Sequence, residues 1–428
     1  MPTPSQPVKT GGQERTPGSV YFGYSSVFLL TLSLVTFYYI NNHSHEPKRH
    51  ELNSPIEFDP LKRIPTKPIL KRSFVDFLAT KASITRFNRL MLFPRLNSLV
   101  TNNYFRYVKV NLNRPCKLWC NDNKCNLRDC KVILSDPQEC PLPTFDNELS
   151  IVNTELASDQ LDLLIKLFEC NDNDDPDSQY VDLLINPERF TGYGGESANR
   201  VWRTIYEENC FIRKNHPPLD DDLCYEERLF YEAISGLHSS INIHLCAEYP
   251  TIGLIGSFKP NLAEFLRRFS DHNDYLENLF TLFLLELKAL RLSEPYLLKQ
   301  VSWPDISTRN AVSGLLRVVD KVDIPSFDDL SLKPSHVSHE LAIHFRNITT
   351  TIIDCVACDK CKLWGKVQLR GLGVAFKILS VKDMEKLHLN HQEIVSLFNA
   401  IARLSHSVKQ LENFRDLVLS RETPDNKR

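Results

Sequence analysis

Glycine is scarce in this sequence, with 14 among 428 residues, about half of the roughly 7% share usual in globular proteins. Runs of alternating apolar and polar residues are few, and neither an internal repeat nor a regular succession of strand and helix patterns is visible. These absences argue against a repeat protein and against a fold built on a parallel sheet. Long stretches instead carry apolar residues three and four positions apart, which predicts a mainly helical protein.

An excess of charge of one sign is also lacking. The chain has 51 lysine and arginine residues against 53 aspartate and glutamate residues, for a net charge of −2. A nearly neutral chain creates no field that would attract DNA or RNA, so no nucleic-acid binding is expected. Hydrophobic residues make up 42% and aromatic residues 10% of the chain, which excludes a disordered protein.

Charged residues are absent from residues 21–40, which read YFGYSSVFLLTLSLVTFYYI. A helix of this length spans about 30 Å, the thickness of a bilayer core, and aromatic residues stand at both of its ends. A cleaved signal peptide is the alternative, but no A-x-A-like site follows, so we expect an uncleaved transmembrane signal anchor. Residues 1–20 are then a disordered cytosolic tail, residues 41–70 a proline-rich luminal linker, and residues 71–428 a luminal domain.

Cysteine is missing from the first 115 residues, although the chain has 12. An even number of cysteines after a membrane-targeting segment predicts a disulfide framework in an oxidising lumen. Asn347-Ile348-Thr349 is a glycosylation sequon in the same part of the chain, and we expect Asn347 to be glycosylated. Residues 112–148 hold five of the cysteines and four prolines, which predicts a long, cysteine-bearing loop.

Helical periodicity is clearest in three segments, residues 223–247, 273–292 and 391–420. In the last of them, apolar residues from Ile394 to Val418 follow three- and four-residue spacing without a proline or glycine. Together the segments predict a single mainly α domain, built as a bundle of several helices.

Cys355, Cys358 and Cys361 form two overlapping CxxC pairs in DCVACDKCKLW. This spacing suits a reactive disulfide, purely structural disulfides, or thiolate ligands of zinc or an iron–sulfur cluster. Thiolate metal sites are disfavoured in an oxidising lumen, so a redox role is favoured over a structural one and no metal is expected. A thioredoxin domain is not expected either, because no strand–helix unit surrounds the motif.

Cys125 and Cys130 form a second pair, which lies in the predicted loop. A bond between them closes few residues and gains little from chain entropy, and such a weakly stabilised disulfide is suited to exchange. A Cys116–Cys355 bond would close roughly 240 residues and contribute about 5 kcal/mol in the entropic account. Spacing alone does not establish that pairing. It also leaves open the partners of Cys120, Cys140, Cys170 and Cys246.

Several long motifs carry a family resemblance. They are, in chain order, RLMLFPRL, YFRYVKVNLNRPC, QYVDLLINPERFTGYGGESANRVWRTIYEENCF, ISGLHSSINIHL, HFRNIT, CDKCKLWGKVQLRGLGVAFKIL and QEIVSLFNAIARLSHSVKQLENFRDL. In these stretches, which lie between residues 89 and 417, the chain resembles the endoplasmic reticulum oxidoreductins, the flavin-dependent thiol oxidases of the secretory pathway.

The resemblance implies a helical bundle that holds FAD beside an active-site pair, Cys358 and Cys361, with Cys361 nearer the isoalloxazine. It also implies that Cys125 and Cys130 form the shuttle disulfide. The implied FAD contacts are Arg189, Thr191, Trp202, Ser235, His238 and Arg268. The chemistry of these residues agrees, since arginine pairs with phosphate and tryptophan offers a flat face to a ring.

The structural disulfides that the resemblance implies are Cys116–Cys355 and Cys210–Cys224. One departure concerns the cofactor. The family's second arginine on the phosphate side would fall near Tyr275, which carries no positive charge, so altered phosphate contacts are expected there. The C-terminal residues DNKR are not a KDEL-type retention signal, so we expect the N-terminal anchor to retain the protein at its membrane.

The resemblance implies oxidation of protein disulfide isomerase by a disulfide relay. Electrons would pass from the isomerase to the shuttle pair, to the active-site pair, to FAD and then to molecular oxygen, giving hydrogen peroxide. The expected activity is that of an FAD-dependent protein thiol–disulfide oxidoreductase, which supports oxidative protein folding on the luminal side of the endoplasmic reticulum membrane. The alternative is a catalytically idle family member that acts as a disulfide-stapled luminal binding protein.

Overall fold

The computed structural model describes residues 72–80, 90–119, 130–134, 175–189, 193, 196–208, 225–248, 259–322, 324, 339–381 and 383–422. All of them belong to one unit, Phe58–Arg428. Within these residues, no helix combines the length and hydropathy that a membrane span requires. The predicted cytosolic tail, anchor and linker lie outside the described residues, as does much of the predicted loop 112–148.

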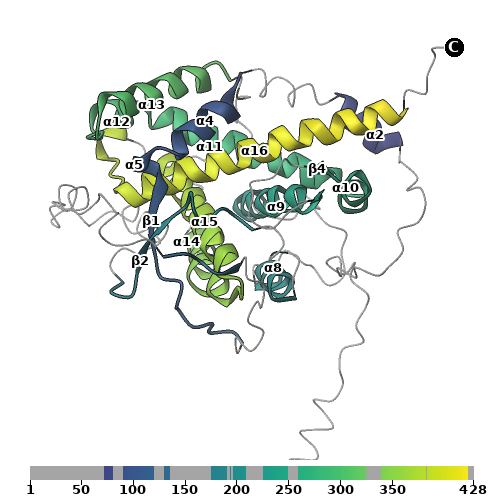
Figure 1. The fold of residues 1–428 in the computed structure, drawn as a ribbon, viewed down its shortest axis with the longest axis horizontal. Helices are drawn as coiled ribbons and strands as arrows, with labels where there is room; N and C mark the ends of the chain where they lie inside the picture. Colours follow the sequence, from purple (N-terminus) through teal and green to yellow (C-terminus); the bar gives the residue numbers. More distant parts are fainter. Residues whose placement is uncertain are drawn as a thin grey trace, which may run out of the picture. The chain divides into compact units, whose positions relative to one another are not determined.

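Four long helices form the centre of the fold (Figure 1). They are α9 (Tyr225–Leu245), α11 (Asn273–Leu292), α15 (Asp359–Ser380) and α16 (His391–Glu422). Helix α16 packs against each of the other three, and α9 packs along α11. The three segments predicted from periodicity correspond to α9, α11 and α16, and the mainly helical fold is confirmed.

Shorter helices complete the described fold. They are α2 (Arg72–Thr80), α4 (Leu92–Val100), α5 (Asn103–Arg106), α8 (Glu196–Glu208), α10 (Leu262–Phe269), α12 (Glu294–Lys299), α13 (Ile306–Val319) and α14 (His339–Asn347). Helices α10 and α13 are capped by the preceding residues, Asn261 and Asp305, whose side-chain oxygens accept hydrogen bonds from backbone N–H groups of the first turn at 3.1 and 2.6 Å. Such caps satisfy donors that have no partner within the helix.

Helix α14 leads the chain toward the CxxC cluster through two irregular turns. A π-helical turn, η3 (Ile348–Ile352), is followed by a 3-10 turn, η4 (Ile353–Cys355), and α15 begins four residues later. Helix α8 packs against both turns. A further 3-10 turn, η5 (Met384–Lys386), lies between α15 and α16. The cluster therefore lies at the start of α15, next to the turns against which α8 packs.

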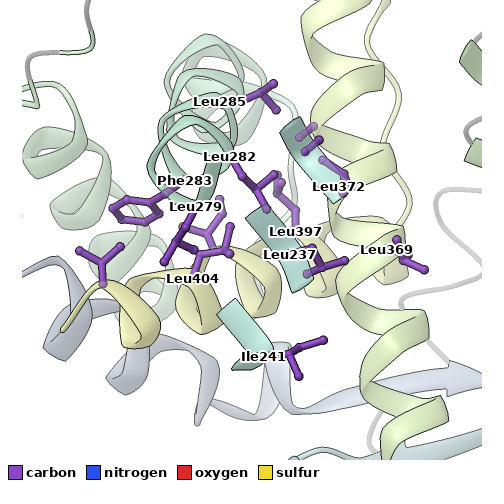
Figure 2. Packing of buried hydrophobic residues seen from close by; sticks show 14 of the residues in the cluster. Leu237, Ile241, Leu279, Leu282, Phe283, Leu285, Leu369, Leu372, Leu397 and Leu404 are labelled. Carbon is purple, nitrogen blue, oxygen red and sulfur yellow. The ribbon is translucent and has the colours of Figure 1, made fainter. Parts of the chain in front are cut away.

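The apolar faces of the four long helices share one core, part of which is drawn in Figure 2. It includes Leu237 of α9, Phe283 of α11, Leu372 of α15 and Leu404 of α16, all of them buried. Burying a side chain of this size is worth about 1.5–3 kcal/mol. The periodicity that predicts the helices therefore also identifies the faces that hold them together.

Two glycines allow these helices to approach closely. A Cβ on Gly236 of α9 would lie 2.4 Å from the carbonyl oxygen of Asn278 in α11. A Cβ on Gly371 of α15 would lie 2.4 Å from the Cβ of Ala400 in α16. No larger residue fits at either crossing without displacing the facing helix, so both glycines set the spacing of the bundle.

Two short antiparallel ladders accompany the helices and were not predicted. Strand β1 (Tyr107–Val110) pairs with β2 (Gln179–Asp182), and β3 (Ala247–Glu248) pairs with β4 (Lys259–Pro260). The Arg106 guanidinium binds Asp182 with two hydrogen bonds, one of them 2.7 Å long, beside the first ladder. Apolar residues of β1 and β2 pack with Leu363 and Val367 of α15, so this ladder covers one face of that helix.

Candidate functional site

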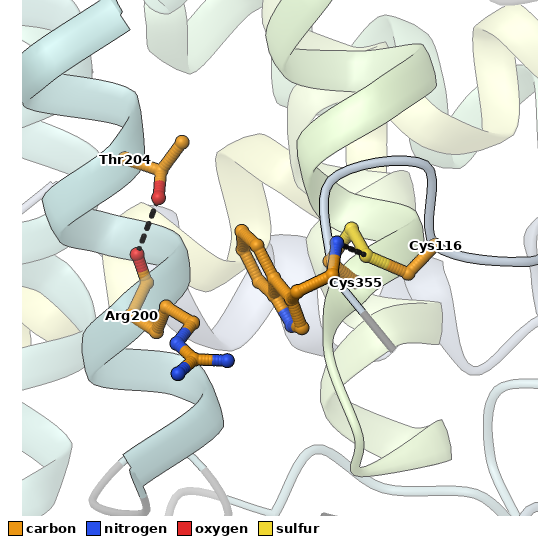
Figure 3. Close-up of a disulfide and its surroundings, with 5 residues drawn as sticks. Cys116, Arg200, Thr204 and Cys355 are labelled. Carbon is orange, nitrogen blue, oxygen red and sulfur yellow. Dashed lines mark hydrogen bonds between the residues drawn. A yellow bond between two sulfur atoms is a disulfide. The ribbon is translucent and has the colours of Figure 1, made fainter. Parts of the chain in front are cut away.

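A disulfide joins Cys116 to Cys355 across 239 positions of the chain (Figure 3), with their Cα atoms 4.5 Å apart. The backbone N–H of Trp119 donates to Cys116 Sγ at 3.3 Å, and the Arg200 guanidinium of α8 lies over the Trp119 ring, 5.4 Å from its centroid. This is the pairing that the family resemblance implies. It anchors the start of the cysteine-bearing segment beside the CxxC cluster.

Cys358 and Cys361 lie at the N-terminus of α15. Cys358 is the residue before the first helical position, and Cys361 lies in the first turn. Both residues are buried, and they are not joined to each other by a disulfide in this structure. The unpaired N–H groups and the dipole at a helix N-terminus stabilise a thiolate. The helix N-terminus is therefore one local influence that favours the thiolate form of these sulfur atoms.

Cys130 approaches this pair from the other segment. Its side chain is buried and hydrogen-bonds with Cys358. That bond lowers the pKa of Cys358, but the hydrogen bond with Cys361 and burial act in the opposite direction, so the pKa is raised overall. The Cys130 segment is held by Asn186, which accepts from the Ile133 N–H at 2.7 Å and donates to the Ile133 carbonyl at 2.6 Å.

Cys361 is enclosed by the segment that follows β2. Its thiol donates to the backbone carbonyl of Arg189 at 3.2 Å, and the Tyr193 hydroxyl donates to the carbonyl of Cys361 at 3.3 Å. Burial raises the pKa of Tyr193 well above its usual value, and the nearby Glu188 and Cys361 raise it further. The hydroxyl therefore remains protonated, and a hydrogen-bond donor, beside the sulfur pair.

Trp202 of α8 and His238 of α9 are stacked, with ring centroids 4.3 Å apart and planes 10° apart. The Tyr206 hydroxyl lies 3.3 Å from His238 Nδ1 and forms a hydrogen bond with it. Burial, and then the charge of Arg268, lower the pKa of His238 to about 3, so this imidazole is neutral at physiological pH. The two predicted cofactor residues thus form an uncharged aromatic stack.

Ser235 and His238 share a face of α9, as their three-residue spacing predicts. Ser235 accepts from Asn278 Nδ2 of α11 at 3.0 Å and also hydrogen-bonds with Tyr206. Arg268 of α10 donates through Nε to Glu264 at 2.7 Å. The structure therefore brings Trp202, Ser235, His238 and Arg268 together from three helices.

The donor set at this site fits a dinucleotide. Arg189 Nε is buried and has no hydrogen-bond partner among the described residues, and a buried donor of this kind suits an anionic oxygen. Trp202 and His238 present ring faces, and Arg268 carries a positive charge beside them. Tyr275, where the sequence predicts altered phosphate contacts, stacks on His272 with ring centroids 4.6 Å apart.

Some predicted positions are not placed by the structure. Cys125, Thr191, Cys210 and Cys224 lie outside the described residues. Asn347 is exposed at the end of α14, while the Thr349 hydroxyl of its sequon is buried and donates to the Phe345 carbonyl at 3.1 Å. Exposure of Asn347 is what a glycan would require.

A buried polar network was missed by sequence reasoning. Glu188 forms an ion pair with Arg403 of α16 and accepts from Gln368 of α15 at 2.9 Å. Arg403 also hydrogen-bonds with His244 of α9, and His244 with the Ser407 hydroxyl at 3.0 Å. The available signal was the presence of such polar residues on otherwise apolar helix faces.

Comparison with known proteins agrees with this geometry. The family model described as Endoplasmic Reticulum Oxidoreductin 1 (ERO1) matches residues 91–411. The Ero1-like protein of Drosophila melanogaster is 36% identical over 435 residues, covering 81% of this chain and 89% of that protein. ERO1-like protein alpha of Homo sapiens is 36% identical over 418 residues, covering 78% and 88%.

A solved structure of Ero1p, described as a source of disulfide bonds for oxidative protein folding in the cell, superposes with a TM-score of 0.59 at 27% identity. It covers 80% of this chain and 99% of that one. A double cysteine-to-alanine mutant of S. cerevisiae Ero1p superposes with a TM-score of 0.58 at 30% identity and the same coverage. The chain therefore belongs to the endoplasmic reticulum oxidoreductin 1 family, the thiol oxidoreductases of oxidative protein folding.

Proposed function

We propose that the chain is an FAD-dependent thiol oxidase in which Cys125 and Cys130 form the shuttle pair and Cys358 and Cys361 the active-site pair. The observation that carries the proposal is the hydrogen bond between Cys130 and Cys358 at the N-terminus of α15. Two cysteine pairs exchange a disulfide only when a thiol of one reaches a sulfur of the other. Cys130 has that position.

The exchange step follows from this contact. The Cys130 thiolate attacks the Cys358 sulfur of the Cys358–Cys361 disulfide, so the Cys130–Cys358 bond forms and Cys361 leaves as a thiolate. Cys125 then attacks Cys130, which restores the shuttle disulfide and releases Cys358 as a thiolate. Two electrons have then moved from the shuttle pair to the active-site pair, and the helix N-terminus stabilises both leaving groups.

The residues that would hold FAD are the aromatic stack of Trp202 and His238 and the charged residues of the site. Trp202 and His238 offer ring faces, and Arg189, with Thr191, and Arg268 supply donors for the phosphates. When bound, FAD would accept the two electrons of the dithiol and pass them to molecular oxygen, giving hydrogen peroxide. Burial keeps bulk solvent from Cys358 and Cys361, which prevents loss of their electrons to other acceptors.

The proposed electron donor is reduced protein disulfide isomerase, whose dithiol would attack the Cys125–Cys130 disulfide through a mixed disulfide. The dithiol–disulfide couple of the isomerase has a reduction potential of about −180 mV, so a strong terminal acceptor such as oxygen is needed to oxidise it. Family membership indicates the endoplasmic reticulum. The proposed anchor at residues 21–40 would hold the enzyme at the luminal face of the membrane.

Oxygen uptake by the full-length protein tests the relay. We expect Cys358→Ala and Cys361→Ala to abolish uptake with every thiol. Cys125→Ala and Cys130→Ala should lose uptake with reduced isomerase but keep part of it with dithiothreitol, because a local opening of the buried site admits a small thiol more readily than a protein. An equal loss in all four variants with dithiothreitol contradicts two successive pairs. A wild-type protein that binds no FAD favours the alternative of an idle, disulfide-stapled binding protein.

A further inference from the structure

The Cys130 segment, residues 130–134, is bound through its backbone by the side chain of Asn186. The Asn186 Oδ1 accepts from the Ile133 N–H at 2.7 Å, and its Nδ2 donates to the Ile133 carbonyl at 2.6 Å. Two such bonds to one residue are the pair that a neighbouring antiparallel strand would make. Nδ2 also donates to the Asp182 carbonyl at 3.0 Å, at the end of β2. The carboxamide is fully buried, so both of its N–H groups and its oxygen are used.

Asn186 is also bound to the helix that carries the active-site pair. The Trp364 indole N–H donates to the Asn186 carbonyl at 2.8 Å, and Trp364 lies in α15, three residues after Cys361. The Asn186 backbone is therefore fixed on α15 while its side chain binds Ile133, three residues after Cys130. Through these contacts Asn186 links the shuttle segment to the start of α15.

Apolar packing contributes little to the docking of this segment. The side chains of Ile133 and Leu134 are 55% and 56% exposed, and Val132 is only partly buried against the cluster that includes Leu363 and Val367. On release, the two hydrogen bonds to Ile133 exchange for bonds to water, so they favour the docked position by a modest factor. Such docking is reversible, as exchange with an external thiol requires.

We propose that Asn186 is the positioning residue of the shuttle exchange: its carboxamide binds the Ile133 backbone and thereby holds Cys130 against Cys358. Release of the same two hydrogen bonds frees the segment for its external thiol partner. The inference rests on the proposed function, in which Cys130 attacks Cys358, and it names the group that brings the two sulfur atoms together. Asn186 acts through the backbone of the segment rather than on the sulfur atoms.

The test measures the effective concentration of Cys130 at Cys358. It uses the full-length protein with Cys125→Ala and Cys361→Ala, so that each of the two remaining thiols has lost the other member of its pair. The protein is equilibrated anaerobically with mixtures of reduced and oxidised glutathione. Formation of the Cys130–Cys358 bond takes two electrons and two protons from the thiols and converts one oxidised glutathione into two reduced molecules. Acid quenching, alkylation and peptide mass spectrometry give the fraction of this bond.

Two substitutions remove the clamp from opposite sides. Asn186→Ala removes the carboxamide, whereas Ile133→Pro removes the backbone N–H that donates to it and leaves Asn186 in place. The control at the same position is Ile133→Ala, which shortens an exposed side chain and keeps both backbone groups. The control for loss of a buried carboxamide is Asn399→Ala, because Asn399 donates to the Phe105 and Val395 carbonyls at 3.0 and 2.9 Å.

Each of the two hydrogen bonds is expected to contribute roughly fivefold to the docking equilibrium. We therefore expect the effective concentration to fall about tenfold or more in Asn186→Ala and about fivefold or more in Ile133→Pro. Both controls should stay within about twofold of the parent. The Cys116–Cys355 bond should remain intact in all four variants, which distinguishes an undocked segment from an unfolded protein. Where Asn186→Ala fails to fold, Ile133→Pro decides.

Three results would overturn the proposal. One is an effective concentration in Ile133→Pro that matches the parent. Another is an equal fall in Ile133→Ala, which would assign docking to side-chain packing. The third is an equal fall in Asn399→Ala, which would indicate a general loosening of the fold. The readout requires neither FAD, isomerase nor oxygen, so a failure of the proposed oxidase activity, seen as absent oxygen uptake, is distinguishable from a failure of this clamp.

Discussion

Replacing Cys116 and Cys355 together by alanine removes a bond between positions 239 residues apart. In the chain-entropy account, opening a loop of this length lowers the free energy of unfolding by about 5 kcal/mol at 25 °C. Domains of ordinary stability unfold with about 5–15 kcal/mol. The double substitution is therefore expected to remove a third or more of the stability and to release the Cys130 segment from the active-site pair.

The assay is urea unfolding of the unsubstituted protein and the double variant under non-reducing conditions, monitored by tryptophan fluorescence. Cys246→Ala is the matched control, because Cys246 is as fully buried as Cys355 but is a free thiol. It reports the cost of losing one buried sulfur, about 1 kcal/mol. If the decrease in the free energy of unfolding of the double variant is no more than twice that of the control, the long-range bond contributes nothing to stability and the entropic reasoning is refuted.

Three further predictions concern other parts of the chain. Tyr275→Arg should tighten FAD binding about tenfold or more by adding one charge-assisted contact, measured by flavin fluorescence quenching; unchanged affinity would remove Tyr275 from the phosphate side. Gly371→Leu should destabilise the protein by at least about 1–3 kcal/mol, because its Cβ would lie 2.4 Å from that of Ala400, and unaltered thermal unfolding would contradict that crossing. The hydrogen bonds from Asn111 and then Arg114 lower the pKa of Asp175 to about 2, so its stabilisation is present above pH 4 and lost as pH falls toward 2; Asp175→Asn and unsubstituted protein should differ in urea midpoint at pH 6 and converge at low pH.

The long helices were predictable because each buries one face along its whole length. The apolar spacing from Ile394 to Val418 continues over most of α16, so no competing structure accounts for it. The strands of β1 and β2 were not predictable in the same way. Each has four residues, and their pairing depends on Val108 meeting Val181, which are far apart in the sequence. A pattern so short does not distinguish a strand from a loop.

The residues of the candidate site also separate into those that a local sequence pattern predicts and those that it does not. Cys358 and Cys361 were predicted because two cysteines at CxxC spacing already suggest a chemistry, and the family motifs predicted Trp202 and His238. Glu188 and Arg403 were missed because an isolated glutamate or arginine is usually a solvated surface residue. Their burial together follows only from the packing of α16 against the segment after β2, and no local pattern encodes that meeting.

The burial of the sulfur atoms has a consequence for selectivity. The thiols of Cys130, Cys358 and Cys361 are exposed by 2%, 1% and 0%. A small thiol such as glutathione, present throughout the lumen, meets none of them without an opening of the protein. Access to the buried sulfur atoms, rather than redox potential, then discriminates between a protein partner and small thiols.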